Sequence, residues 1–197
     1  MKRTFRYEIL TDLVVCLCQT IVNGLGYDSL QANLMTVPPW LFGYAVCLLL
    51  AWSADTHNAR GWHVAASSTV GFVGWLVQAV LPADSYKARY AMLFFCASGA
   101  FPSANPLSGW VTSNVPSVTT MFLAVAMHNS CAGVGSLIAQ WIWLDSEAET
   151  GYTTGNSVCA ACSAGVVVTC IGLRLYYGHL NKQGIEDASG KRRVWLY

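Results

Sequence analysis

The sequence predicts an all-α membrane protein with six transmembrane helices. Of its 197 residues, 54% are hydrophobic and only 11% are charged, whereas soluble domains carry about 25% charged residues. Long apolar runs recur along the chain, and a run of about 20 residues is what a helix needs to cross a bilayer core. The polar segments between the runs are short. We therefore expect one transmembrane domain over residues 1-178, followed by a polar tail over residues 179-197.

The first expected helix, over about residues 8-23, is the weakest of the six. Uninterrupted apolar sequence covers only Leu13 to Val22, about half of the length that a bilayer needs. Basic residues near the N-terminus raise the alternative of a secretory signal peptide, but Glu8, Asp12 and the lack of an A-x-A cleavage pattern argue against it. We expect a short or truncated first helix.

The second helix, over residues 35-54, is the clearest. It is apolar on all sides, unlike the two-faced helix of a soluble core. Pro38 and Pro39 lie in its first turns, where missing N–H groups cost least. Trp40 and Trp52 stand near its two ends, where aromatic rings favour the membrane interface.

Four further helices are expected, each an apolar run bounded by polar or proline-containing sequence. An acidic loop at residues 145-149 separates the last two. The four helices cover residues 62-81, 89-110, 119-143 and 157-177.

Lysine and arginine are distributed unevenly between the two sides of this arrangement. Only Lys87 and Arg89 lie on one side, and nine such residues lie on the other. Because loops rich in Lys and Arg stay in the cytoplasm, we expect both termini in the cytoplasm and the 145-149 loop outside. This orientation requires an even number of helices, which supports the first one. The nine residues are Lys2, Arg3, Arg6, Arg60, Arg174, Lys182, Lys191, Arg192 and Arg193.

Several classes of function are disfavoured. A net charge of +1 gives no basic face for nucleic acid. No carboxylate pair, metal-ligand cluster or nucleophile with a base falls together within a predicted span, so we expect no enzyme, metal site or cofactor. Most cysteines lie in apolar runs, where thiols behave as small hydrophobes. The Cys159-x-x-Cys162 pair is interpreted as helix packing rather than redox or metal chemistry, since no second ligand pair follows.

The fifth helix carries the most informative polar residues. At 100° per residue, His128 shares one side with small residues, Asn129 and Gln140 lie on the adjoining face, and bulky apolar residues lie opposite. Lipid favours the bulky side, so the polar side should face other helices or a water-filled cavity. Two interpretations stay open: helix packing with His128 and Asn129 hydrogen-bonded across the interface, or a pathway for substrate or protons.

Prolines in the fourth helix form a second candidate region. Pro102 and Pro106 each release a carbonyl group one turn earlier, and Asn105 precedes Pro106. Broken helices are tolerated in membranes where protein, water or ligand satisfies the released groups, an arrangement typical of transporter sites. The alternative is a kink that binds nothing. Near the end of the sixth helix, Arg174 is expected to reach toward lipid headgroups.

Several segments between Thr20 and Gln183 resemble, in order, the carboxyl-terminal half of a family of fungal transporters. They are GLGYDSLQANLMTVPPW, AWSADTHNARG, ARYAMLFFCASGAFPSANPLSGWVTSNV, GSLIAQWIWL and YTTGNS. The family is the allantoate permease (anion:cation symporter) group of the major facilitator superfamily. Its members have twelve helices in two halves with the site between them, and this chain is expected to supply the second half. The terminal KRRVWLY is similar to the family's ending, which predicts a natural C-terminus.

The resemblance implies proton-coupled transport of a small organic anion or vitamin-like metabolite across the plasma membrane. Its implied partners are the lipid bilayer, a small-molecule substrate, and either a second transporter half or a second copy of the chain. The alternatives are a non-transporting remnant, a membrane subunit that binds another protein, or an exporter of metabolites.

The family's cytoplasmic loop motif is matched by Asp55, Arg60 and Gly61. In the family this Asp cooperates with helix-end dipoles and arginines to hold a closed state. Thr56 stands where a basic residue is usual, so the closed state is expected to be weaker. In the fifth helix, Ala132 and Gly133 replace the family's Gly-Asn pair, so the substrate contacts are expected to differ.

Overall fold

The computed structural model describes residues 21–22, 29–57, 60–115, 117–142, 147 and 150–183. Side chains are described for these residues except at 29–30, 32–33, 103–106, 132 and 135–140. Within this part of the chain the regular structure is helical and contains no strand, in agreement with the all-α expectation. The five long helices are α2 (Ser29–Thr56), α3 (Arg60–Val80), α4 (Tyr86–Ser113), α5 (Val118–Ile142) and α6 (Thr153–Gln183).

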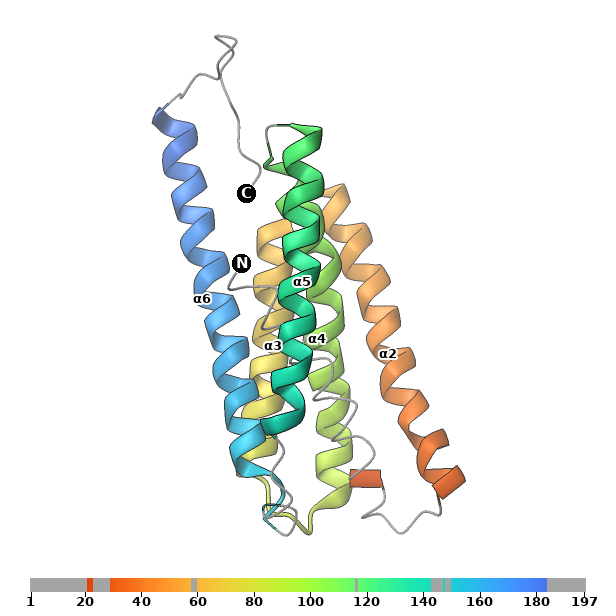
Figure 1. Ribbon diagram of the computed structural model, residues 1–197. Coiled ribbons are helices and arrows are strands. Elements are labelled where there is room, and N and C mark those ends of the chain that lie inside the picture. Colours follow the sequence, from red (N-terminus) through yellow and green to blue (C-terminus); the bar gives the residue numbers. More distant parts are fainter. Residues whose placement is uncertain are drawn as a thin grey trace.

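The helices lie side by side in a bundle (Figure 1). Helix α3 packs between α4 and α6, α2 packs mainly on α4, and α5 makes only slight contact with α4 and α6. Short connections make consecutive helices antiparallel, so the bundle has two ends. We call one the Arg60 end, where α2 and α4 finish and α3 begins. The Arg89 end is the other, where α3 finishes and α4 and α6 begin.

Helices α3 and α4 approach each other most closely at two glycines. A Cβ atom added to Gly99 would lie 2.2 Å from the Cα atom of Gly71, and one added to Gly74 would lie 3.0 Å from the backbone nitrogen of Cys96. No side chain fits between the helices at the first point. Small residues at such crossings let membrane helices pack through their backbones.

Two buried clusters complete the packing. The cluster nearer the Arg89 end joins Trp75 of α3 to Leu93 and Cys96 of α4 and Cys159 of α6. The cluster nearer the Arg60 end contains Val64, Leu107, Trp110, Val166 and Cys170. The six described cysteines are free thiols, and three of them belong to these clusters, as expected for thiols that act as small hydrophobes.

Three of the described helices are long and apolar enough to cross a membrane, as judged by length and composition. They are α3, α6 and the Leu34–Thr56 part of α2. The expectation of six transmembrane helices is not confirmed, because the first one falls almost wholly outside the described residues; Ile21 and Val22 are helical and buried. Large apolar side chains point outward, including Leu49, Trp52 and Phe122, which are 65%, 71% and 67% exposed.

The helices extend beyond the predicted apolar runs. Helix α2 begins at Ser29 rather than residue 35, and α6 continues to Gln183, so residues 179–183 of the expected tail are helical. Hydropathy locates the membrane-crossing part of a helix, whereas polar end turns keep their backbone hydrogen bonds beyond it. The expectation of a broken fourth helix was also wrong: α4 is continuous through Pro102 and Pro106, since neighbouring turns hold the helix on either side of each missing N–H group.

Candidate functional site

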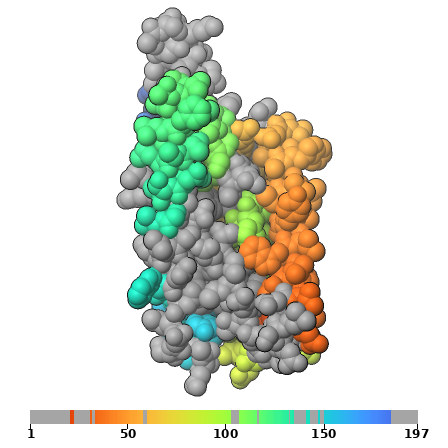
Figure 2. Space-filling model, turned by 45° about the vertical axis from the view of Figure 1, so that its right-hand side comes forward, coloured from red at the N-terminus to blue at the C-terminus, as the bar shows by residue number. Residues whose placement is uncertain are grey.

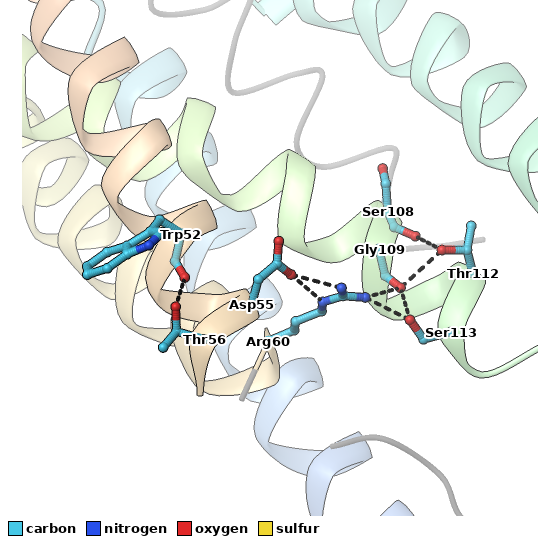
Figure 3. A network of polar contacts seen from close by, with 8 residues as sticks. All are labelled: Trp52, Asp55, Thr56, Arg60, Ser108, Gly109, Thr112 and Ser113. Atoms are coloured by element: carbon cyan, nitrogen blue, oxygen red, sulfur yellow. Dashed lines mark hydrogen bonds and ion pairs between the residues drawn. The ribbon is translucent and has the colours of Figure 1, made fainter. Parts of the chain in front are cut away.

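Arg60 joins three helices at the Arg60 end (Figure 3). Its Nε and Nη2 atoms donate to Oδ1 of Asp55 in the last turn of α2, at 3.2 and 2.8 Å. Its Nη1 atom donates to the carbonyl oxygen of Gly109, at 2.9 Å, and to the hydroxyl of Ser113, at 2.7 Å. Both acceptors lie in the last turns of α4. We call this set of four residues the Arg60 clasp.

The local sequence explains why the clasp forms. The chain reverses between α2 and α3 within a few residues, so Arg60 comes to lie beside Asp55. Gly109 lies near the C-terminal end of α4, where the helix dipole favours a cation, and its carbonyl oxygen also accepts from the hydroxyls of Thr112 and Ser113. Asp55 is 68% exposed and Arg60 29% exposed, and an exposed ion pair contributes only about 0 to 1 kcal/mol. The clasp therefore sets the relative position of three helix ends more than it stabilises the fold.

Two glycines leave space for large side chains at this end of the bundle, Gly109 for Arg60 and Gly61 for Trp110. A Cβ atom on Gly109 would lie 3.0 Å from Nη1 of Arg60, and one on Gly61 would lie 3.3 Å from the Trp110 ring. Thr56 stays outside, because its hydroxyl donates to the carbonyl oxygen of Trp52 in its own helix, at 2.8 Å. It adds no charge to the network.

The structure thus brings together the loop residues Asp55, Arg60 and Gly61 that the sequence singled out. It adds Gly109 and Ser113, which the sequence analysis missed. These two lie 49 and 53 residues from Arg60, so no local pattern connects them to it. The signal that existed was a small residue and a hydroxyl near the end of a predicted helix, which is too common to single them out.

His128 reaches from α5 to α4. Its Nε2 atom lies 3.1 Å from the hydroxyl oxygen of Ser108, and the direction of donation depends on which ring nitrogen carries the proton. Ser108 directly precedes Gly109, whose carbonyl oxygen binds Arg60. The candidate proton site on α5 and the clasp therefore meet at two consecutive residues of α4.

The remaining pathway candidates are dispersed. Asn129 is exposed on α5, and Pro102 is buried within α4. The side chains of Asn105 and Gln140 lie outside the described ones. Among the described side chains, the structure links His128 to α4 but does not gather the predicted set around one site.

A second polar network closes the Arg89 end. Nε of Arg89 donates to Oε1 of Gln78 at 3.2 Å, Nε2 of Gln78 donates to the backbone carbonyl of Arg89 at 2.9 Å, and Nη2 of Arg89 donates to the carbonyl oxygen of Gly151 at 2.5 Å. Arg89 is only 3% exposed. The sequence analysis counted Arg89 as one of two cations on that side of the membrane and did not predict that the end of α3 and the turn before α6 cover it.

Arg174 has an aromatic partner that the sequence did not predict. Its guanidinium carbon lies 4.6 Å from the centroid of the Trp62 ring, so it packs from α6 onto α3 as a cation–π pair. The expectation that it reaches toward headgroups missed this aromatic face, which comes from a helix more than a hundred residues earlier in the sequence.

The known proteins that this chain resembles include several named as transporters. No family model matches the chain, and no solved structure matches it. It is 45% identical over 179 residues to "MFS transporter prlL" of Fungal sp. (strain NRRL 50135), covering 90% of this chain and 36% of that protein. It is 29% identical over 155 residues to "MFS-type transporter cnsO" of Penicillium expansum, covering 72% of this chain and 29% of that protein.

The chain is similar to fungal major facilitator transporters. A third relative, "Major facilitator-type transporter hxnP" of Emericella nidulans, is 34% identical over 112 residues, covering 56% of this chain and 23% of that protein. The chain spans about a third of the length of the curated relatives it matches. These relatives are named as transporters, and together with the apolar helices they support an integral membrane protein.

Proposed function

We propose that the chain forms the second six-helix half of a proton-coupled major facilitator transporter of the allantoate permease (anion:cation symporter) family. Its substrate would be a small organic anion or vitamin-like metabolite, carried across the fungal plasma membrane. The observation that carries this proposal is the link through Ser108 and Gly109, which connects His128 of α5 to Arg60 of α3.

The link supplies a way for a proton to act on the clasp. A neutral imidazole nitrogen can accept a hydrogen bond from the Ser108 hydroxyl, whereas both nitrogens of an imidazolium can only donate. If Nε2 of neutral His128 accepts from Ser108, protonation of His128 reverses or breaks this contact. Because the next residue supplies the carbonyl oxygen that binds Arg60, the end of α4 responds at both contacts. An ionisable group inside an apolar helix is expected to have such a role.

The orientation of the proposal follows from the arginines. The Arg60 end would face the cytoplasm together with both termini, because most Lys and Arg residues belong to that side. Burial of Arg89 leaves Lys87 as the exposed cation that the predicted outer loops contribute. This strengthens the asymmetry on which the orientation rests.

Proton-coupled uptake can be tested in liposomes that contain the protein and an entrapped pH dye. A panel of monocarboxylates is added outside, and coupled uptake acidifies the interior. We expect His128→Leu to keep normal insertion and yield but to abolish acidification, while Met127→Leu on the neighbouring lipid-facing position transports normally. Acidification that persists in His128→Leu would contradict the role of His128. No acidification with any member of the panel would favour the non-transporting subunit.

A further inference from the structure

Four buried polar atoms on α3 and α6 have no hydrogen-bond partner among the described residues. They are Oγ of Ser68 and Nε1 of Trp75 on α3, and Oδ1 of Asn156 and Oγ of Ser163 on α6. The four residues are between 0% and 2% exposed. Leaving a buried donor or acceptor unpaired is costly, so native structures almost always provide a partner from protein or ordered water.

The packing of the two helices places these atoms at two levels. Helices α3 and α6 are antiparallel neighbours. Their register is marked by Val64 and Val166, which share one buried cluster, and by Trp75 and Cys159, which share the other. Residue numbers therefore increase along α3 in the direction in which they decrease along α6.

The four residues follow this register. Trp75 lies seven residues after Ser68, and Asn156 lies seven residues before Ser163. Ser68 and Ser163 thus share one level of the interface, and Trp75 and Asn156 share another, about 10 Å nearer the Arg89 end at 1.5 Å per residue.

The chemistry of each level is complementary. The indole of Trp75 can only donate, and Oδ1 of Asn156 can only accept. The orientation of the Asn156 amide is set by its Nδ2 atom, which donates to the carbonyl oxygen of Gly151 at 3.1 Å. At the other level, two hydroxyls can each donate and accept. In contrast, the neighbouring hydroxyl of Ser67 already donates to the carbonyl oxygen of Val64, at 3.1 Å.

We infer that the α3–α6 interface holds internal water at these two levels, one site bridging Ser68 and Ser163 and the other bridging Trp75 and Asn156. Water fits this chemistry because it donates and accepts, and a buried water needs two or more polar partners. The two helices would then be fastened by water within the bundle and by Arg89 at its end. This inference does not depend on the transport proposal.

Radiolytic footprinting tests the Trp75 site directly. X-ray pulses split water into hydroxyl radicals, and a side chain beside an ordered internal water is oxidised although bulk solvent does not reach it. Trp110 is the matched control, because it is also a buried tryptophan, 3% exposed, packed in an apolar cluster with a Tyr177 ring. With rates normalised to the unfolded chain, we expect Trp75 to be oxidised several-fold faster than Trp110. Equal, slow oxidation of both would overturn the Trp75 site.

A double-mutant cycle tests the serine site. Ser68→Ala and Ser163→Ala each remove one hydroxyl and favour the helix by propensity, so a merely unpaired hydroxyl predicts equal or higher thermal stability in detergent. A bridging water predicts a lower unfolding midpoint for each variant and a double variant little worse than either single one. Combining Ser68→Ala with Trp75→Phe, at the other level, should give additive losses. Single variants that are as stable as the parent chain, or more stable, would overturn the serine site.

Discussion

The imidazole Nε2 atom of His128 and the hydroxyl oxygen of Ser108 lie 3.1 Å apart, and this contact fastens α5 to the last turns of α4. Among the described residues, α5 otherwise makes only slight contact with α4 and α6. Along its described side chains it carries exposed apolar residues such as Phe122 and Val134. One polar contact therefore has a large share in fixing where α5 lies on the bundle.

Ser108→Ala should alter the pH dependence of transport without lowering the yield of folded protein. The substitution removes the Ser108 hydroxyl that contacts His128 and leaves an alanine that suits a helix. Uptake at several external pH values measures the effect. Ser130→Ala is the control, since that hydroxyl is exposed and donates to the carbonyl oxygen of Ala126 in its own helix. An unchanged pH profile in Ser108→Ala would mean that the contact does not carry the coupling.

Arg60→Lys should loosen the Arg60 end. A lysine retains the charge but has a single ammonium group, so it cannot bind Asp55 and both α4 acceptors in the same geometry. We expect a cysteine placed at Val115, just past the end of α4, to react faster with a maleimide in detergent-solubilised protein of this background, while overall stability falls by at most about 1 kcal/mol. Lys87→Arg is the control, because Lys87 is exposed at the other end. Unchanged labelling would show that Arg60 does not hold α4.

Gly99→Ala should destabilise the bundle strongly. The new methyl group would meet the backbone of Gly71 at 2.2 Å, and backbone atoms cannot move aside as a flexible side chain can. Overpacking of this kind costs about 1 to 3 kcal/mol, which would lower the thermal midpoint in detergent by several degrees. Gly172→Ala should be neutral, since its Cβ atom would meet nothing within 4 Å. Similar midpoints for both variants would refute the close crossing.

Topology can be tested with tags at both termini in intact cells. If the chain crosses the membrane six times with its Lys and Arg residues inside, neither tag is accessible to external protease. A tag inserted at residue 147 should be cleaved from outside. Tags on opposite faces would remove the first helix, over residues 8-23, from the proposed arrangement.

A partner across α5 can be detected by cross-linking. Gly133 lies on the small and polar side of α5 and is exposed, with nothing within 4 Å of its Cβ position, whereas Val134 lies on the bulky side and is 53% exposed. In a background without native cysteines, Gly133→Cys should cross-link to a second copy more efficiently than Val134→Cys, because polar and small faces favour helix association in membranes. Equal yields would exclude this face as the contact.

Apolar runs in the sequence predicted the five long helices that the structure describes, and the family resemblance pointed to Asp55 and Arg60 of the clasp. The apolar run of α2 and the proximity of Asp55 to Arg60 are both readable within a few residues. Gly109 was not, because its role is to offer a carbonyl oxygen, which every residue carries. Arg89 was misplaced for a related reason: its cover comes from Gln78 and Gly151, 11 and 62 residues away. Hydropathy gives the position of Arg89 near a helix end, but it does not show which distant residues cover its side chain.

Helices α2 and α5 form much of the surface on the face shown in Figure 2, whereas α3 packs between α4 and α6. The close contact between Gly71 and Gly99 limits how α3 and α4 can move relative to each other. Two helices whose backbones touch near their midpoints cannot slide past each other, but they can change the angle at which they cross. If α4 tilts about this point so that Gly109 moves away from Arg60, its far end moves the opposite way and carries Arg89. The glycine crossing would then act as the pivot between the Arg60 end and the Arg89 end of α4.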